Sequence, residues 1–124
     1  MFIRFVAGLE GEGHRSLTGI ITEARLLREQ GGLDEYQSER LEELYTWFND
    51  HVPCPPFSSA GWIEDAVAWF KDDAGPAIAK MWELAALLRE CGVPVRMLRS
   101  ASPGKILYED SHQVVVEEWA RLER

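Results

Sequence analysis

The chain has 124 residues, of which 46% are hydrophobic and 27% are charged. This length accommodates one domain with one hydrophobic core, and we therefore expect a single domain over residues 1–124. The 13 basic and 21 acidic residues give a net charge of −8, which excludes general electrostatic binding to nucleic acids or to an anionic membrane surface.

The N-terminal part predicts a strand followed by a helix. Residues 2–7 are rich in aromatic and β-branched side chains, which are typical of strands. Glycines then interrupt the pattern, and Ser16 or Thr18 can cap a helix that runs to about Gln30. The Gly31-Gly32 pair ends this helix, because glycine accepts the left-handed backbone conformation that follows many helices.

A second helix is expected from Asp34 to shortly before Pro53. Asp34 and Gln37 have the spacing of a capping box, in which each side chain accepts a hydrogen bond from an otherwise unpaired backbone N–H. Leucines and aromatic residues recur at helical spacing on one side, and glutamates occupy the other. The two helices are joined by two glycines, which favours an antiparallel helical hairpin.

The middle of the chain predicts a connection and two further helices. Residues 53–61 contain three prolines and are expected to form a rigid connection, followed by a short helix over about residues 63–71. Asp72 or Asp73 can cap the next helix, which ends at Gly92.

Strand signals return in the last third of the chain. Alternating side chains and turn residues predict three strands, over residues 93–98, 106–108 and 113–117, separated by turns at Ser102-Pro103-Gly104 and Asp110-Ser111. The segment from Trp119 to Arg124 fits either an extension of the last strand or a helical turn.

The expected element order is β-α-α-(α)-α-β-β-β, where the bracketed helix is the short one. Helices that are followed by a run of strands favour an α+β fold, with the helices packed on one face of a small, mainly antiparallel sheet. We expect the last three strands to form a meander, with the first strand beside one of them. The other face of the sheet would then be open to solvent or to a partner.

No motif predicts catalysis, a metal or a cofactor. The glycines after the first strand fit neither the dinucleotide-binding nor the Walker pattern, and Glu10 and Glu12 would repel a phosphate. No nucleophile elbow is present, and neither Cys54 nor Cys91 has a histidine at a spacing that indicates a catalytic pair or a complete metal site. We therefore expect no cofactor, no metal and no membrane segment, and two reduced thiols in a bacterial-type cytoplasm.

Basic residues on the predicted strands are candidates for binding an anionic ligand, since arginine makes paired hydrogen bonds to carboxylates and phosphates. The candidate ligand-binding residues are Arg4, Arg96, Arg99, Lys105, Tyr108, Asp110 and His112. Arg96 and Arg99 are three residues apart and would face opposite ways on an ideal strand, so unless a bulge intervenes only one of them can share a site with Arg4. The alternative for Asp110 is a structural one, in which its carboxylate bonds to the backbone of its own turn.

Aromatic residues outside the predicted helices are candidates for contacting a protein partner. Trp62 follows a glycine in the proline-rich connection, close to Phe57, and Trp119 lies near the C-terminus. The alternative is that the connection folds its aromatic side chains onto the helices.

Two functions are compatible with these features. The first, which we favour from the sequence, is a small acidic regulatory protein that binds a protein partner or forms a homodimer, with no catalysis assumed. The second is a small-ligand-binding protein or enzyme that acts on a phosphate- or carboxylate-bearing substrate at the sheet face.

The charge is unevenly distributed along the chain. Residues 1–9 and 91–108 contain four basic residues and no acid, whereas residues 10–90 contain 7 basic and 16 acidic residues. The acid-free windows cover most of the predicted strands, and the acidic segment covers the helices. The sequence therefore predicts an acidic helical layer on a locally basic sheet, whose arginines either pair with nearby acids or mark a binding face.

Overall fold

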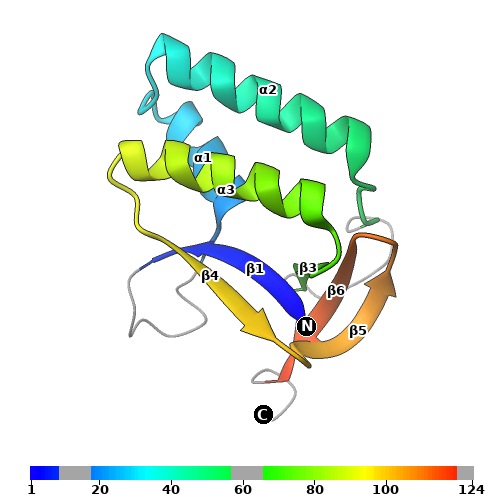
Figure 1. The fold of residues 1–124 in the computed structure, drawn as a ribbon. Coiled ribbons are helices and arrows are strands. Elements are labelled where there is room, and N and C mark those ends of the chain that lie inside the picture. Colours follow the sequence, from blue (N-terminus) through cyan, green and yellow to red (C-terminus); the bar gives the residue numbers. More distant parts are fainter. Residues whose placement is uncertain (9–17, 57–65, 120–124) are drawn as a thin grey trace.

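The computed structural model describes residues 1–8, 18–56 and 66–119, and its helices lie together on one side of the sheet (Figure 1). These residues form six strands and three helices, in the order β1 (Phe2–Ala7), β2 (Thr18–Gly19), α1 (Ile20–Glu29), α2 (Glu35–His51), β3 (Val67–Lys71), α3 (Gly75–Glu90), β4 (Val95–Ser100), β5 (Gly104–Glu109) and β6 (Gln113–Glu118). The predicted α+β class is confirmed.

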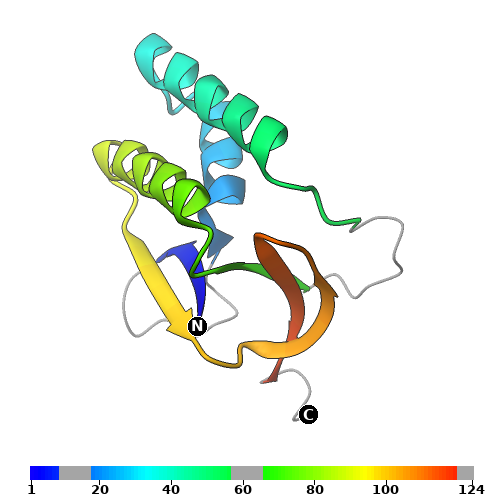
Figure 2. The same cartoon turned by 45° about the vertical axis from the view of Figure 1, so that its right-hand side comes forward.

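Strand β1 connects the two halves of the sheet. One of its edges pairs with β4 along the whole strand, from Phe2 opposite Ser100 to Ala7 opposite Val95. The other edge is shared, with β3 paired at the Phe2 end and β2 at the Ala7 end. Strand β3 then pairs with β6, and β6 with β5, and all of these pairings are antiparallel. Figure 2 shows that the sheet curls, so that β5 and β6 curve round toward β4.

The main hydrophobic core lies between the helices and one face of β1 and β4. Alternate residues of β1 point into it, namely Ile3, Phe5 and Ala7. The helices contribute fully buried side chains such as Leu44 and Leu84. This core accounts for the helical layer, because each helix has an apolar stripe that must be covered.

The opposite face of the sheet, which we call the inner face, lies inside the curl of the strands and is buried at its centre. A second apolar cluster lies here, formed by Trp69, Val114, Val116 and the partly buried Phe2, Val67 and Leu98. The expectation that this face is open to solvent or to a partner was wrong for its centre, where Trp69, Val114 and Val116 are buried. The charged residues on the same face, Arg4, Arg96 and Glu118, are only half-buried.

The predicted short helix over residues 63–71 was also wrong. Residues 67–71 form strand β3, and residues 63–65 lie outside the described part of the chain. β3 lies between β1 and β6, with Trp69 on the inner face and Phe70 against the helical core. A strand that is apolar on both faces lacks the usual alternation of apolar and polar residues, so its period resembles that of a short buried helix.

The predicted C-terminal meander is only partly correct. β5 and β6 form the expected hairpin and β1 pairs with a C-terminal strand, but β4 pairs with β1 and not with β5. Residues 101–103 carry the chain from one edge of the curled sheet to the other (Figure 2). Gly104 belongs to β5, where it pairs with Glu118, and does not form a tight reversal after β4.

One of the predicted starts of the three described helices is confirmed, and the other two differ from the prediction. The capping box of α2 is confirmed, since Gln37 N–H donates to Asp34 Oδ1 over 2.8 Å and Asp34 N–H donates to Gln37 Oε1 over 3.1 Å. α1 starts later than predicted because Thr18 and Gly19 pair with β1. α3 has Ala74 and not Asp72 or Asp73 at its N-cap, and no side chain caps it.

Candidate functional site

Two of the predicted arginines lie on the inner face. In the β1–β4 register, Arg4 is opposite Leu98 and Arg96 is opposite Val6, so the two arginines are diagonal neighbours on adjacent strands. Arg99 is opposite Ile3, which belongs to the helical core, and its side chain is exposed on that other side of the sheet. The prediction that Arg96 and Arg99 face opposite ways is confirmed.

The guanidinium of Arg4 carries a poorly compensated charge. Burial lowers the pKa of Arg4, and the negative charge of Glu118 only partly offsets this effect. Within the described residues Arg4 forms no hydrogen bond or ion pair. Its Nη2 atom lies 4.0 Å from the position that a Cβ on Gly19 would take, so the guanidinium lies close to β2.

Two buried hydrogen-bond donors near Arg4 also lack acceptors. The indole Nε1 of Trp69 and the Nε of Arg96 are both buried and have no hydrogen-bond partner among the described residues. Trp69 is only 5% exposed, and it occupies the inner face of β3. Each such donor costs about 1–3 kcal/mol relative to a satisfied one, so buried polar groups are usually paired. This feature distinguishes the inner face from an ordinary apolar cluster.

Sequence reasoning missed Trp69 as a site residue. It assigned residues 63–71 to a helix, whereas the strand places Val67, Trp69 and Lys71 on one face. Val67, Trp69 and Lys71 are each two residues apart, which is the spacing of side chains on one face of a strand. This spacing was the signal in the sequence that could have identified β3.

The predicted residues Tyr108, Asp110 and His112 gather at the β5–β6 turn. Asp110 Oδ1 accepts hydrogen bonds from the backbone N–H groups of His112 (2.8 Å) and Gln113 (3.1 Å). Its Oδ2 accepts from the Tyr108 hydroxyl (2.9 Å) and from Gln113 Nε2 (3.2 Å), and the same Nε2 donates to the Pro53 carbonyl (2.7 Å). The structural alternative for Asp110 is therefore confirmed, because this carboxylate organises its own turn.

The pKa of Asp110 reflects this network. Burial by itself would raise the pKa, but the hydrogen bonds from His112, Tyr108 and Gln113 outweigh burial and lower it. The hydrogen bond to Asp110 is also the main reason that the pKa of Tyr108 is raised.

We expect Asp110→Asn to destabilise the protein by about 1 kcal/mol at neutral pH, because the amide cannot accept every hydrogen bond that the carboxylate accepts. A lowered folded-state pKa stabilises the protein above the unfolded-state value of about 3.9, and this stability is lost as the pH falls through the folded-state pKa. The difference between wild type and Asp110→Asn should therefore shrink in urea titrations at about pH 3. Asp73→Asn, an exposed change before α3, serves as the control; a difference that stays constant with pH would contradict the prediction.

The β5–β6 turn and Glu118 lie at opposite ends of β6. The turn precedes Gln113, whereas Glu118, whose charge acts on Arg4, ends the strand. At about 3.4 Å per residue, these two ends are about 17 Å apart. Lys105 is exposed and lies opposite Glu117 on the neighbouring strand. The seven predicted ligand residues are thus divided among several places, and the structure brings only Arg4 and Arg96 to the inner face.

Of the predicted partner-binding residues, only Trp119 lies in the described part of the chain; Phe57 and Trp62 lie outside it. Trp119 is 44% exposed. Its indole Nε1 donates to the Ser102 carbonyl (2.8 Å) and approaches the Ser102 hydroxyl (3.2 Å), which holds the end of β6 to the β4–β5 connection.

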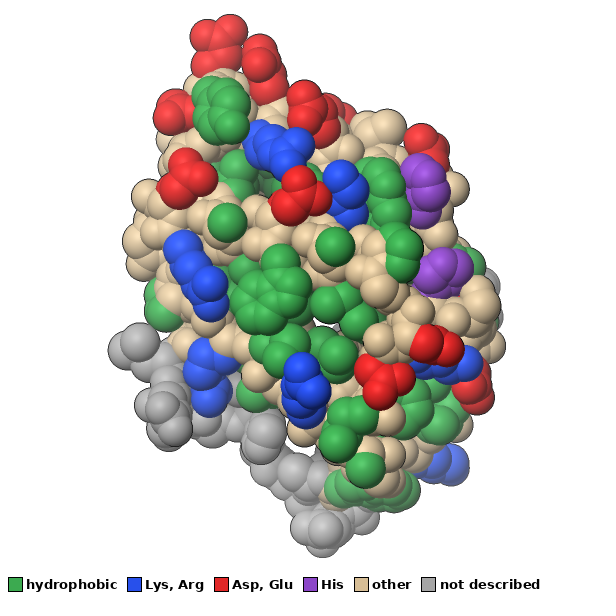
Figure 3. All heavy atoms as spheres, viewed as in Figure 1, with side chains coloured by type: hydrophobic (Ala, Val, Ile, Leu, Met, Phe, Trp, Pro, Cys, Tyr) green, Lys and Arg blue, Asp and Glu red, His purple; other side chains and the backbone are tan. Residues whose placement is uncertain are grey.

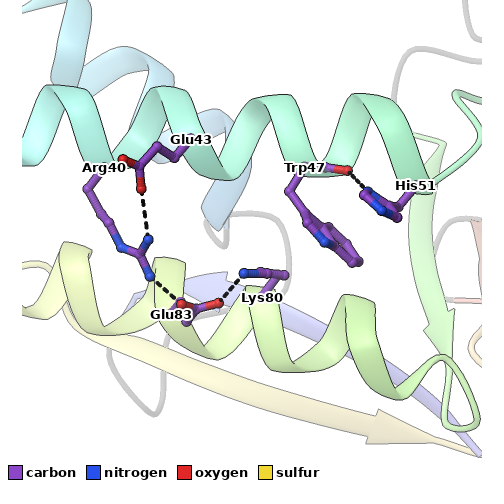
Figure 4. Close-up of polar contacts among 6 residues, drawn as sticks. All are labelled: Arg40, Glu43, Trp47, His51, Lys80 and Glu83. Carbon is purple, nitrogen blue, oxygen red and sulfur yellow. Dashed lines mark hydrogen bonds and ion pairs between the residues drawn. The ribbon is translucent and has the colours of Figure 1, made fainter.

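The seam between α2 and α3 carries the most connected surface ion pairs. Arg40 contacts both Glu43 and Glu83, and Lys80 Nζ lies 3.1 Å from Glu83 (Figure 4). The hydrogen bond to Glu43 is the main reason that the pKa of Arg40 is raised, and the hydrogen bond from Lys80 is first among the groups that lower the pKa of Glu83. Because these charges compensate one another, the seam is explained by the packing of two helices.

The negative charge of the helical layer is concentrated on one helix. Residues 34–51, which are α2 and its cap, contain six acids and one arginine, so they contribute −5 of the net −8. Acidic side chains gather at the top of the surface in Figure 3, over this helix. The predicted acidic layer is therefore mainly the outer side of α2.

Within residues 1–8, 18–56 and 66–119, no three metal-ligating side chains of His, Cys, Asp or Glu come together. The helices in these ranges are too short or too polar to cross a bilayer. No protein-family model, curated protein or solved structure matches the chain.

Proposed function

We propose that this protein binds a small carboxylate- or phosphate-bearing ligand on its inner face, through Arg4, Arg96 and Trp69. The observation that carries the proposal is the set of buried donors without acceptors on this face, namely Trp69 Nε1 and Arg96 Nε, beside the poorly compensated charge of Arg4. An anion would supply both the missing acceptors and the missing charge.

The arrangement of the described inner-face residues favours binding of an anion over acid–base catalysis by Tyr108 and Asp110. General acid–base chemistry needs a titratable group within hydrogen-bond reach of the ligand. The Tyr108–Asp110 pair is at the opposite end of β6 from Glu118, and its carboxylate is occupied by the turn. We therefore assign the described inner-face residues a role in ligand recognition.

The test is ligand-induced stabilisation in a chloride-only buffer, with sodium benzoate and sodium phosphate as probes and uncharged benzamide as the reference. Either anion should raise the melting temperature of the wild type, and calorimetry should show that Arg4→Met, Arg96→Met and Trp69→Phe each weaken binding by about tenfold or more. Without a probe, Arg4→Met should be more stable than wild type by about 1 kcal/mol, because it removes a desolvated charge.

Arg99→Met is the matched control, since Arg99 lies on the same strand as Arg96 but faces the other way. Its affinity for the probes should equal that of the wild type. The proposal fails if neither anion stabilises the folded wild type, or if Arg99→Met weakens binding as much as Arg96→Met does.

We propose partner binding through α2 as a second candidate function, favoured by the concentration of acids on this helix around the 67% exposed Tyr36. The partner would present a basic groove, and binding would weaken as salt is added. The test is binding to an immobilised basic protein. Binding that persists in 0.5 M salt (about three times the physiological level) would contradict this candidate. Binding that persists after the double change Glu39→Gln and Glu43→Gln would contradict it as well.

A further inference from the structure

We infer that Glu118 restricts the inner face to monoanions, so that the ligand is a monocarboxylate carried on an apolar body. This inference rests on the proposed function and specifies the ligand class of the same site.

The position of Glu118 follows from the pairing of β6. Val114, Val116 and Glu118 alternate along this strand, and the two valines are fully buried on the inner face or its margin. Glu118 is half-buried beside Gly104 of β5.

β1 and β6 run in the same direction on either side of β3, with Ile3 level with Gln113. The guanidinium of Arg4 leans toward Gly19, the partner of Val6, and so toward the Glu118 end of β6. Glu118 forms no ion pair or hydrogen bond with the described residues, and its charge partly offsets the burial of Arg4. Glu118 is therefore close enough to influence an anion bound by Arg4 without neutralising Arg4 through a direct contact.

The charges on this face sum to a small positive value. Among the described residues, Arg4 and Arg96 contribute two positive charges and Glu118 one negative charge, which leaves +1. Lys71 is compensated separately, because its Nζ lies 2.6 Å from Glu109. A carboxylate would bring the sum to zero, whereas a phosphate dianion would leave an uncompensated negative charge in a partly desolvated place. Such a charge is costly, so the site should discriminate between the two.

The surroundings of the arginines are apolar. Val6 lies opposite Arg96 and Leu98 lies opposite Arg4, so the diagonal between the two arginines is lined by aliphatic side chains. Val116 and Trp69 continue this apolar surface on the neighbouring strands. A ligand held by the guanidinium groups would therefore place its remaining atoms against hydrocarbon, which favours an apolar body over a sugar or nucleotide.

The experiment compares benzoate with phenyl phosphate, which share a ring, by calorimetry at pH 8, where the phosphate is a dianion. The wild type should bind benzoate about tenfold or more tightly than phenyl phosphate. Glu118→Gln should bind phenyl phosphate about tenfold more tightly than the wild type does, because the competing charge is gone. Glu117→Gln is the matched control, since this neighbour lies opposite Lys105 and faces the other side of the sheet.

The outcomes separate the two proposals. Equal affinities for both probes in the wild type, or a Glu118→Gln variant that discriminates like the wild type, would overturn the restriction by Glu118 while leaving anion binding in place. If neither probe binds to wild type or Glu118→Gln, and circular dichroism shows both proteins folded, then anion binding on the inner face is itself overturned.

Discussion

Replacing Phe5 by alanine should lower the free energy of unfolding by about 4 kcal/mol. Phe5 is 2% exposed in the helical core and lies opposite Met97 on β4. Its ring meets Trp82 of α3 edge-on, with the centroids 4.8 Å apart, so the change removes a sheet-to-helix contact as well as buried area. A domain of this size is stable by about 5–15 kcal/mol, so the loss would be a large fraction of the total.

The effect of Phe5→Ala is measured as a fall in the urea midpoint at an unchanged slope. Tyr36→Ala removes a large aromatic side chain that is 67% exposed on α2, and it should change the stability by about 0.5 kcal/mol or less. Similar losses of unfolding free energy for Phe5→Ala and Tyr36→Ala would contradict the contact between β1 and the helices through Phe5.

Gly104→Ala is expected to destabilise the protein by about 3 kcal/mol. A Cβ at this position would lie 2.2 Å from the Glu117 carbonyl oxygen and 2.8 Å from its carbon. Both atoms belong to the backbone of β6, so the clash cannot be relieved by rotating a side chain. The start of β5 would have to separate from β6, where Gly104 now pairs with Glu118.

Gly75→Ala is the matched control for this prediction. Gly75 is the first residue of α3, and apart from its chain neighbours and the backbone of its own helix, no described atom lies within 4 Å of the position that its Cβ would take. Because alanine favours the helix, Gly75→Ala should be neutral or stabilising by up to about 1 kcal/mol. Opposite signs for the two changes in urea unfolding would show a steric cause; equal losses would contradict it.

The parts of the fold that local sequence patterns determine were predictable. The capping box at Asp34, the glycine ends of two helices and the β5–β6 hairpin each depend on neighbouring residues. The identity of β3 and the pairing of β4 were not predictable in this way. β3 is apolar on both sides because it lies between two other strands, and β4 pairs with a strand from the far end of the chain.

The candidate site was also predictable only where it depends on local sequence patterns. The opposite orientations of Arg96 and Arg99 follow from strand geometry, and the register confirmed them. Trp69 joins these arginines because β3 pairs with β1, a long-range pairing that no local pattern determines. Glu118 joins them through the curl of the sheet, which depends on all of the strands together. Conversely, Asp110 and His112 are close to Arg96 in the sequence but belong to a turn whose hydrogen bonds keep them elsewhere.

The pairing of β1 with β4 also determines the order in which the molecule can assemble. β1 is synthesised before β4, and because Phe2 pairs with Ser100, the longest edge of β1 stays uncovered until the chain has been made as far as Ser100. The β5–β6 hairpin and the α1–α2 pair close short loops and can form quickly, whereas closing the loop between β1 and β4 is entropically expensive. The rate-limiting event of folding should therefore be the docking of β4 onto β1, and until then the apolar segment Phe2–Ala7 is the part of the nascent chain most exposed to aggregation.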